Sequence, residues 1–564
     1  MHLWQNTLVG LISVVLGAHY TGFLPLPRLS SHQSTPDETE RFSCRPFLPP
    51  LFVHSPPHID DPLIKAASLR TGQFLESRFS KKDIDSLSVA VVSSNGVLFE
   101  ANYGVMRGNE SGTSPATTSD SMYRIASVSK LFTVLEGHIL AEKGVISWDD
   151  PVNKYLPDFK PRLDATSATE PSVTLFQLAN HMSGLGRDWP PGNVANWPKD
   201  LFGAGPPPTN GLPFPDHASL FRAIEKNPLV SHPYAIPGYS NTGIGVLGLA
   251  LVAANRIANG PREPSSYATL LERDIFDPLG LNGSHFLTTD NNKHLVVVPS
   301  LAPEVADQDF LDAMNPAGGQ FSSLRDSITV LQTLLNPSDQ RSLITKQTMD
   351  SWMHTFHAFE EDDLTEVGFL WEIVKARDSN NRFRKIYWKL GAMAGYHAAL
   401  AIHPGTSYGV AVLLGGHYPD AAKIAYDVFE LFQPAIDHSL ADLANSMYAG
   451  KWTSSDGKSS ATVSVDKGTL YVEHLDVNGT DILSMFNSPH RVALRWTHHD
   501  KFRLDIGIPF YNGKMHMGCY PYWVGMDLWG MRDGNALNAI EFSGDETGRR
   551  LHVPAIGMEM TRGR

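Results

Sequence analysis

A serine and a lysine stand three residues apart within the segment from Arg124 to Phe132. Apolar residues recur from Leu131 to Ile139 with the period of an amphipathic helix, and Gly144 gives a plausible end. A helix that begins near Ser127 places Lys130 one turn on and on the same face, where its amine can reach the serine hydroxyl. The helix start also leaves backbone N–H groups free to bind a developing anion. The segment thus offers the nucleophile, base and oxyanion donor of a serine acyl-enzyme mechanism.

The same four-residue pattern also arises by chance, as a solvated lysine beside a helix-capping serine. Other features of the chain must therefore decide its meaning. At 564 residues, two or three domains are expected, and 42% hydrophobic with 19% charged residues is typical of a globular protein. A net charge of -13 without a basic cluster argues against nucleic acid as a partner. No spacing of cysteine and histidine resembles a metal site, and no cofactor is implied.

The N-terminus carries an apolar run from Leu8 to Leu16, followed by Gly17 and Ala18. This run is too short to span a bilayer, and no other segment of the sequence is long and apolar enough. We predict a signal peptide at residues 1–18, followed by a proline-rich arm over residues 19–60. No lysine or arginine precedes the run, so an uncleaved anchor is the alternative. The expected location is outside the cell or in the lumen of the secretory pathway.

Three Asn-x-Ser/Thr sequons agree with that route, with acceptors at Asn109, Asn282 and Asn478. The chain has two cysteines, Cys44 and Cys519. In an oxidising compartment they could form a disulfide between the N-terminal arm and the C-terminal region. The alternative is a pair of buried free thiols.

Two regions differ in their local pattern. Residues 61–440 predict an α+β domain in which β-rich runs at both ends enclose helical segments, so that the terminal segments share an antiparallel sheet flanked by helices. Two β-rich runs meet at Asn95-Gly96, which predicts a hairpin. Residues 315–320 predict a tight loop, and residues 186–235 a long irregular segment, either a lid or pocket wall or a surface insertion. From residue 446 to 564 short β-type runs alternate with turns, which predicts a separate all-β sheet or barrel.

Two further motifs accompany the serine and lysine. Tyr239-Ser240-Asn241 lies at a predicted loop-to-helix junction, and Lys389-Leu390-Gly391 ends a predicted strand before Ala392. The order Ser-x-x-Lys, Tyr-x-Asn, Lys-x-Gly resembles that of the penicillin-recognising serine enzymes. Over roughly residues 75–435 the chain is similar to the superfamily of class C β-lactamases and low-molecular-weight penicillin-binding proteins, which includes esterases. The C-terminal β-region resembles the lipocalin-like extension of some eukaryotic members.

The residue types suggest roles within this constellation. Ser127 needs a base, and either Lys130 or Tyr239 could take its proton, or the two could share it. Asn241 offers an amide that orients the substrate or the lysine. The resemblance implies that the oxyanion is bound by the backbone N–H groups of Ser127 and Ala392, the residue after Lys389-Leu390-Gly391.

One residue departs from the family pattern. β-Lactamases usually have a hydroxyl residue in the middle of the third motif, where it helps to bind the substrate carboxylate, whereas this chain has Leu390. Leucine cannot donate a hydrogen bond, so Lys389 alone would serve a carboxylate, and we expect inefficient hydrolysis of penicillins. Leu390, Met393 and the aromatic residues of segment 186–235 suit an apolar acyl chain better.

We therefore expect a serine hydrolase that acts on a small-molecule ester or amide through a Ser127 acyl-enzyme. An acyltransferase that uses the same intermediate is one alternative. A peptidase of D-amino acid peptides or a β-lactamase is another, and a catalytically silent binding protein on this scaffold is a third.

Overall fold

The computed structural model describes residues 44–563, apart from residues 111, 113, 165–170, 487, 489, 508–517 and 546–547. The expected signal peptide and most of the proline-rich arm lie outside the described residues. The described chain divides into two units: residues 56–376 and 383–432 form the first, and residues 44–55, 377–382 and 433–563 form the second. The expected boundary at residues 440–446 lies inside helix α13 (Ala421–Tyr448), whose first part belongs to the first unit.

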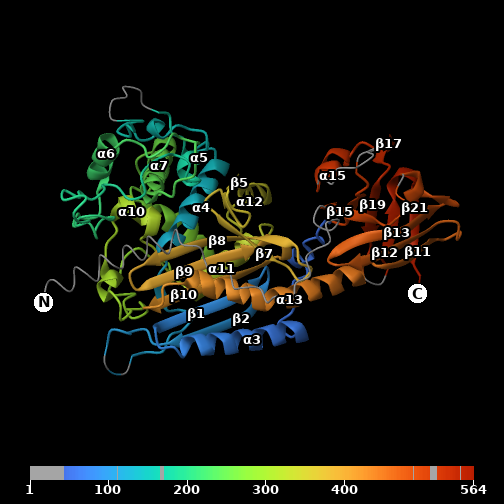
Figure 1. Ribbon diagram of the computed structural model, residues 1–564, viewed down its shortest axis with the longest axis horizontal. Coiled ribbons are helices and arrows are strands. Elements are labelled where there is room, and N and C mark those ends of the chain that lie inside the picture. The colour runs from blue at the N-terminus through green and yellow to red at the C-terminus, as the bar shows by residue number, and fades with distance from the viewer. Residues whose placement is uncertain are drawn as a thin grey trace. The chain divides into compact units, whose positions relative to one another are not determined.

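An eight-stranded antiparallel sheet forms the centre of the first unit (Figure 1). Its strand order is β2-β1-β10-β9-β8-β7-β6-β5. The strands are β1 (Ile84–Ser93), β2 (Gly96–Gly104), β5 (Thr355–Ala358), β6 (Thr365–Gly368), β7 (Glu372–Arg377), β8 (Phe383–Met393), β9 (Tyr396–His403) and β10 (Tyr408–Gly416). Because β1 pairs with β10, the N-terminal and C-terminal strands of the first unit lie side by side in one sheet. The predicted α+β fold is confirmed.

The predicted hairpin joins β1 and β2, but its turn lies one residue earlier than the Asn-Gly pair suggests. Ser93 pairs with Gly96, so Ser94 and Asn95 are the two turn residues and Gly96 is already the first residue of β2.

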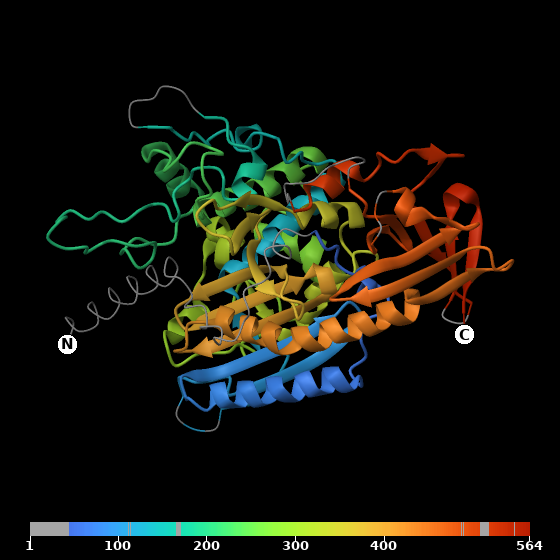
Figure 2. The same ribbon diagram turned by 45° about the vertical axis from the view of Figure 1, so that its right-hand side comes forward.

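Helices cover both faces of this sheet. They are α3 (Pro62–Phe79), α4 (Ser129–Glu142), α5 (Leu175–Ala179), α6 (His217–Lys226), α7 (Asn241–Asn259), α8 (Tyr267–Leu271), α9 (Asp277–Leu279), α10 (Leu311–Gly318), α11 (Leu324–Leu335), α12 (Lys346–Trp352) and α13. Along β1, Ala90 and Val92 belong to the large core that contains α4, α7 and α11. On the opposite face Phe99 of β2 contacts Phe432 of α13, and α3 runs alongside β2 (Figure 2). The central strands β1, β9 and β10 are therefore buried on both sides, which explains the apolar runs in their sequences.

The glycines of α7 set the spacing of the helical layer. A Cβ atom added to Gly245 would lie 2.3 Å from the Ala313 carbonyl oxygen, and one added to Gly248 would lie 2.2 Å from Pro316. Helix α10 therefore packs directly against the backbone of α7. Among the described residues α7 alone is long and apolar enough to cross a membrane, and 72% of that stretch is buried inside the fold.

The tight loop predicted at residues 315–320 is wrong for residues 315–318, because α10 continues to Gly318 with Pro316 inside it. Proline removes one backbone donor, which usually ends a helix. Here Pro316 packs on Gly248, and the Pro316 carbonyl accepts a hydrogen bond from Thr133, so tertiary contacts hold the turn in helical form. Residues 186–235, all of them described, are irregular as predicted except for α6.

The second unit contains a closed antiparallel barrel of eight long strands. They are β11 (Gly450–Ser454), β12 (Ser460–Asp466), β13 (Thr469–Val477), β15 (Val492–His498), β16 (Lys501–Leu504), β19 (Ala539–Ser543), β20 (Arg550–Val553) and β21 (Met558–Arg562). Each pairs with its neighbour in this series, and β21 pairs with β11 to close the ring. The short β14 (Thr480–Asp481) extends β13. Such an up-and-down connectivity is that of lipocalin barrels, and the expected all-β domain is confirmed.

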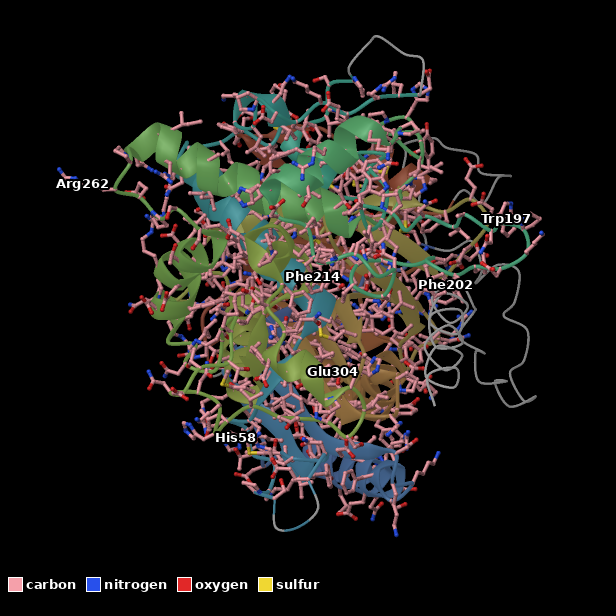
Figure 3. All side chains as sticks on the ribbon, turned by 90° about the vertical axis from the view of Figure 1, so that its left-hand side faces the viewer. His58, Trp197, Phe202, Phe214, Arg262 and Glu304 are labelled. Atoms are coloured by element: carbon pink, nitrogen blue, oxygen red, sulfur yellow. A yellow bond between two sulfur atoms is a disulfide. The ribbon has the colours of Figure 1, made fainter. Side chains whose placement is uncertain are left out.

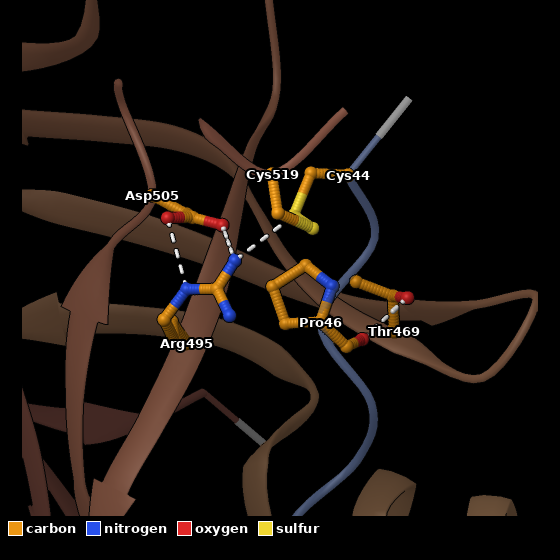
Figure 4. The surroundings of a disulfide bond; sticks show 6 residues. All are labelled: Cys44, Pro46, Thr469, Arg495, Asp505 and Cys519. Carbon is orange, nitrogen blue, oxygen red and sulfur yellow. Dashed lines mark hydrogen bonds and ion pairs between the residues drawn. A yellow bond between two sulfur atoms is a disulfide. The ribbon is translucent and has the colours of Figure 1, made fainter. Parts of the chain in front are cut away.

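Cys44 and Cys519 form a disulfide within the second unit, with Cα atoms 4.8 Å apart (Figure 4). Arg495 lies beside it, donates to Cys44 Sγ and forms an ion pair with Asp505. The Pro46 carbonyl accepts a hydrogen bond from Thr469 of β13. The described end of the N-terminal arm is thus attached to the barrel.

Candidate active site

Ser127 lies in a short 3-10 turn, η2 (Ala126–Val128), between strand β3 (Met122–Arg124) and α4. The residue before it, Ala126, has φ 48°, a left-handed conformation that is unusual for a residue with a side chain. Ile125 N–H donates to the Gln320 carbonyl, and Ser129 Oγ donates to the Ala126 carbonyl, so both sides of the turn are fixed. Ser127 itself is half-buried. Strained backbone held in this way is frequent at functional sites.

Lys130 reaches Ser127 as its position in the helix predicts. Its Nζ lies 2.9 Å from Ser127 Oγ and 2.5 Å from the Ala317 carbonyl oxygen of α10. The side chain is fully buried. Burial, followed by repulsion from Lys389 and Arg187, holds the pKa of Lys130 well below that of an ordinary lysine. A neutral amine beside the serine hydroxyl can accept its proton.

Tyr239 stands before the N-terminus of α7 with its hydroxyl inside the site. This oxygen is buried and has no hydrogen-bond partner among the described residues. Burial, reinforced by the Glu372 carboxylate, raises the pKa of Tyr239 above that of an ordinary tyrosine, although the nearby Ser127 hydroxyl lowers it. The phenol is therefore protonated at neutral pH, and its O–H is free to donate to a substrate.

Three basic side chains surround the Tyr239 ring. Lys130 Nζ lies 5.0 Å from the ring centroid, Lys389 Nζ 5.1 Å and Arg187 Cζ 4.9 Å. His181 lies against the ring at a centroid separation of 4.5 Å. Its Nδ1 accepts the Ser240 backbone N–H, and burial and the neighbouring cations hold the pKa of His181 well below its usual range. His181 is thus a neutral support for the ring.

Asn241, the first residue of α7, is joined to the basic group through Asp188. Its Nδ2 donates to Asp188 Oδ1 at 2.6 Å, and the other Asp188 oxygen lies 3.1 Å from Arg187 Nε. The Arg187 carbonyl accepts the Asn241 backbone N–H. Asn241 therefore has a fixed orientation beside Tyr239.

Lys389 has a carboxylate partner, whereas no carboxylate of the described residues pairs with Lys130. Lys389 Nζ donates to Glu372 Oε1 at 2.5 Å and to the Leu390 carbonyl at 3.0 Å. The second carboxylate oxygen, Glu372 Oε2, accepts the Leu390 backbone N–H at 3.1 Å. Lys389 is fully buried, whereas 27% of the Glu372 side chain is exposed. One carboxylate thus occupies two donors of the third motif.

Gly391 brings β8 against the nucleophile. A Cβ atom added to Gly391 would lie 2.1 Å from the Ile125 carbonyl oxygen and 3.2 Å from Ser127 N, so no larger residue fits without a shift of the backbone. The next residue on β8, Ala392, is half-buried. This close approach is compatible with an oxyanion site made by the N–H groups of Ser127 and Ala392.

The irregular segment 186–235 has two parts of different character (Figure 3). Trp189 is buried, and its backbone N–H donates to Thr242 of α7. Phe214 stacks on Phe310 at 4.7 Å. In contrast, Trp197 and Phe202 are 69% and 78% exposed. Trp189 thus ties the start of the segment to α7, beside Asn241, while its exposed aromatic residues are not packed into the core.

The three sequon asparagines, Asn109, Asn282 and Asn478, are all exposed. Asn109 borders a polar cavity of about 400 Å³ with Arg107 and Lys293. Across the described part of the chain, no group of three or more His, Cys, Asp or Glu side chains is arranged to hold a metal ion.

Sequence reasoning named Ser127, Lys130, Tyr239, Asn241, Lys389, Gly391 and Ala392, and the fold brings them together. It missed Glu372, Arg187 and Asp188. Glu372 is an acidic residue within the apolar run Phe369 to Val374, which is a signal because a carboxylate in such a strand needs a partner. The adjacent charges Arg187 and Asp188 stand among glycines, prolines and aromatic residues, and they gave a weaker signal.

The comparisons with known proteins agree on one family. The family model described as Beta-lactamase matches residues 72–432. The chain is 36% identical over 312 residues to Beta-lactamase-like protein str6 of Strobilurus tenacellus, an alignment that covers 53% of this chain and 99% of that protein. It is 25% identical over 432 residues to Probable hydrolase M10 of a Phoma species, which covers 72% of this chain and 68% of that protein.

Among solved structures, the octameric penicillin-binding protein homologue from Pyrococcus abyssi aligns with a TM-score of 0.51 at 18% identity. That alignment covers 87% of this chain and 99% of the archaeal one. The beta-lactamase/D-alanine carboxypeptidase from Yersinia pestis aligns with a TM-score of 0.51 at 21% identity, over 66% of this chain and 98% of that one. At these identities the likeness is one of fold.

Proposed function

This chain belongs to the beta-lactamase family of serine hydrolases, and from this premise we propose that it hydrolyses a small-molecule ester or amide with an apolar acyl group through an acyl-enzyme on Ser127. The observation that carries the proposal is the contact between Lys130 Nζ and Ser127 Oγ at 2.9 Å, made by a buried lysine whose pKa is lowered. A nucleophilic serine with an adjacent neutral base is the requirement of this chemistry.

In the first step Ser127 Oγ attacks the substrate carbonyl carbon while its proton passes to Lys130 Nζ. The carbonyl oxygen becomes an oxyanion, for which the backbone N–H groups of Ser127 and Ala392 are the donors. One such donor typically contributes a factor of ~10²–10³ to the rate. The bond to the leaving alcohol or amine then breaks, and the leaving group takes a proton from the site.

Tyr239 is suited to deliver that proton. Its O–H has no acceptor among the described residues, and the amine of Lys130, 5.0 Å from its ring centroid, can restore the proton afterwards. In the second step water attacks the ester on Ser127, gives up its proton to the same base, and the acid is released. Ser127 regains the proton that Lys130 holds, so the cycle consumes only substrate and water.

Intact-mass spectrometry tests the proposal directly. The purified protein is incubated with p-nitrophenyl esters of increasing acyl length, with Ser127→Ala as the matched variant. We expect a mass increase equal to one acyl group, and burst release of nitrophenol, in the wild type alone. Nitrocefin serves as the β-lactam probe, and we expect slow turnover because Leu390 lacks a hydroxyl. Equal labelling of the wild type and Ser127→Ala contradicts the proposal, and so does the absence of labelling with every acyl donor tested.

We also propose that the protein passes through the secretory pathway. The Cys44–Cys519 disulfide and the exposed positions of Asn109, Asn282 and Asn478 support this. Treatment of the protein from its native source with a peptide N-glycosidase should lower its mass, and N-terminal sequencing should show removal of residues 1–18. An unchanged mass and an intact N-terminus would contradict the proposal.

A further inference from the structure

We infer that Glu372 is a specificity-determining residue that restricts the site to acyl donors without a negative charge. This inference rests on the proposed function and adds the substrate class to it. Glu372 lies at the start of β7, and its carboxylate occupies the place where the anionic group of a substrate would otherwise bind.

The contacts of Glu372 are those of a bound anion. Oε1 accepts from the Lys389 ammonium at 2.5 Å and Oε2 accepts from the Leu390 backbone N–H at 3.1 Å. A cationic donor and a neutral backbone donor converging on one carboxylate form a favourable anion site. In this protein the Glu372 side chain occupies that anion site, and both the Lys389 ammonium and the Leu390 N–H already donate to it.

The charges around the site support the same conclusion. Lys389 is paired with Glu372, and Arg187 with Asp188. Lys130 favours its neutral form because burial lowers its pKa. The group of residues around Tyr239 therefore has little net positive charge. Since 27% of the Glu372 side chain is exposed, a substrate carboxylate that approached Lys389 would meet this carboxylate first, and like charges repel.

A purely structural role is the competing explanation. Glu372 satisfies the Leu390 N–H and provides the counter-ion of a buried lysine, and both contacts stabilise the strands. That role predicts a loss of stability when Glu372 is changed, with no change in preference between neutral and anionic acyl donors. Substrate preference therefore separates the two explanations.

The experiment compares two esters of similar length, p-nitrophenyl hexanoate and the mono-p-nitrophenyl ester of glutaric acid, which carries a terminal carboxylate. Wild type, Glu372→Gln and Glu372→Asp are assayed at several pH values from 6 to 8. We expect Glu372→Gln to raise the ratio of kcat/KM for the anionic ester to that for the neutral ester by about tenfold or more. Glu372→Asp keeps the charge and should keep the preference of the wild type.

The matched control is Glu366→Gln on the neighbouring strand β6, which removes a carboxylate paired with Lys375 and Lys385 outside the site. It should leave the ratio unchanged. A ratio for Glu372→Gln within twofold of the wild type, with activity retained, overturns the inference.

Binding without turnover keeps the inference separate from the proposed function. In a Ser127→Ala background, calorimetry with monoethyl glutarate and with ethyl hexanoate measures affinity alone. Adding Glu372→Gln should tighten binding of the anion by about tenfold and leave the neutral ester unaffected. Equal anion affinity with and without Glu372 overturns the inference even if the wild type is an active esterase. If Glu372→Gln tightens binding of monoethyl glutarate but the wild type shows no Ser127-dependent acylation, the inference is sustained and the proposed hydrolysis is rejected.

Discussion

Two buried lysines lie within about 5 Å of the same tyrosine ring, and their surroundings differ. On the serine side, which comprises residues 125–130, Lys130 contacts a hydroxyl and a carbonyl, and no carboxylate of the described residues pairs with it. On the strand side, Glu372 with residues 389–392, Lys389 has the Glu372 carboxylate. Both side chains are fully buried. Desolvation without a counter-ion favours a neutral amine, whereas desolvation beside a carboxylate favours an ion pair.

The difference explains why one chain uses the same residue type twice in one site. Lys130 can exchange a proton, and Lys389 supplies a fixed charge that is already balanced. The two sides should therefore respond differently to the same substitution.

The largest effect is expected when Lys130 and Lys389 are replaced by arginine, one at a time. Arginine is always charged and cannot act as a base at neutral pH. Lys130→Arg should lower kcat/KM for a p-nitrophenyl ester by about 10³-fold or more, since a general base is lost. Lys389→Arg should lower it less than about tenfold, because Glu372 can pair with either cation. Near-equal losses in the two variants, with unchanged circular dichroism, would refute the division of roles.

The next effect concerns the phenol of Tyr239, near both lysines. Tyr239→Phe preserves the ring that the cations contact and removes the unpartnered hydroxyl. We expect kcat to fall by about 10²-fold because proton delivery to the leaving group is lost. Esters with a better leaving group need less protonation, so the defect should shrink with p-nitrophenyl relative to ethyl esters. A defect of the same size for both leaving groups would assign Tyr239 another role.

A smaller effect is expected at Asp188, which holds Asn241 in place. Asp188→Ala leaves the Asn241 amide without its 2.6 Å acceptor. The half-buried Asn241 amide loses its orientation without this acceptor, so kcat/KM should fall by about tenfold, which corresponds to ~1.4 kcal/mol. Asp188→Asn keeps an acceptor oxygen and should recover most of the activity. If alanine and asparagine behave alike, the charge of Asp188 matters and the hydrogen bond does not.

The pH dependence tests the neutral state of Lys130. A base acts when deprotonated, so kcat/KM should rise with pH as Lys130 loses its proton. Because its pKa lies well below that of an ordinary lysine, the rise should be complete well below pH 10.5. Lys389→Met removes a repelling cation, which raises the pKa of Lys130 and moves the rise to higher pH. A shift to lower pH would contradict the assigned electrostatics.

The smallest effect on turnover should come from a change outside both sides of the site. The double variant Cys44→Ser, Cys519→Ser removes the disulfide of the second unit. Loss of a native disulfide typically costs about 2–5 kcal/mol, so the melting temperature of the barrel should fall. The kcat/KM of the first unit should remain within twofold of the wild type. A large loss of activity would show that the lysines depend on the barrel.

Much of the site could be predicted because its motifs are local. Ser127 and Lys130 are one helical turn apart, and Tyr239 and Lys389 belong to short patterns of their own. Glu372 could not be placed, since its contact with Leu390 depends on how β7 and β8 lie against each other. The helix through Pro316 was missed for a similar reason. Its stability comes from Gly248 and Thr133, which are distant in sequence.

The pairing of β1 with β10 also has a consequence for synthesis. Ile84 pairs with Gly416, so β1 leaves the ribosome long before its partner strand exists. Until then the run from Leu87 to Val92, buried on both faces in the finished fold, has one open edge and no cover. Open apolar edges invite pairing with other chains. The nascent chain should therefore depend on a chaperone up to about residue 416, and truncation before β10 should yield aggregates.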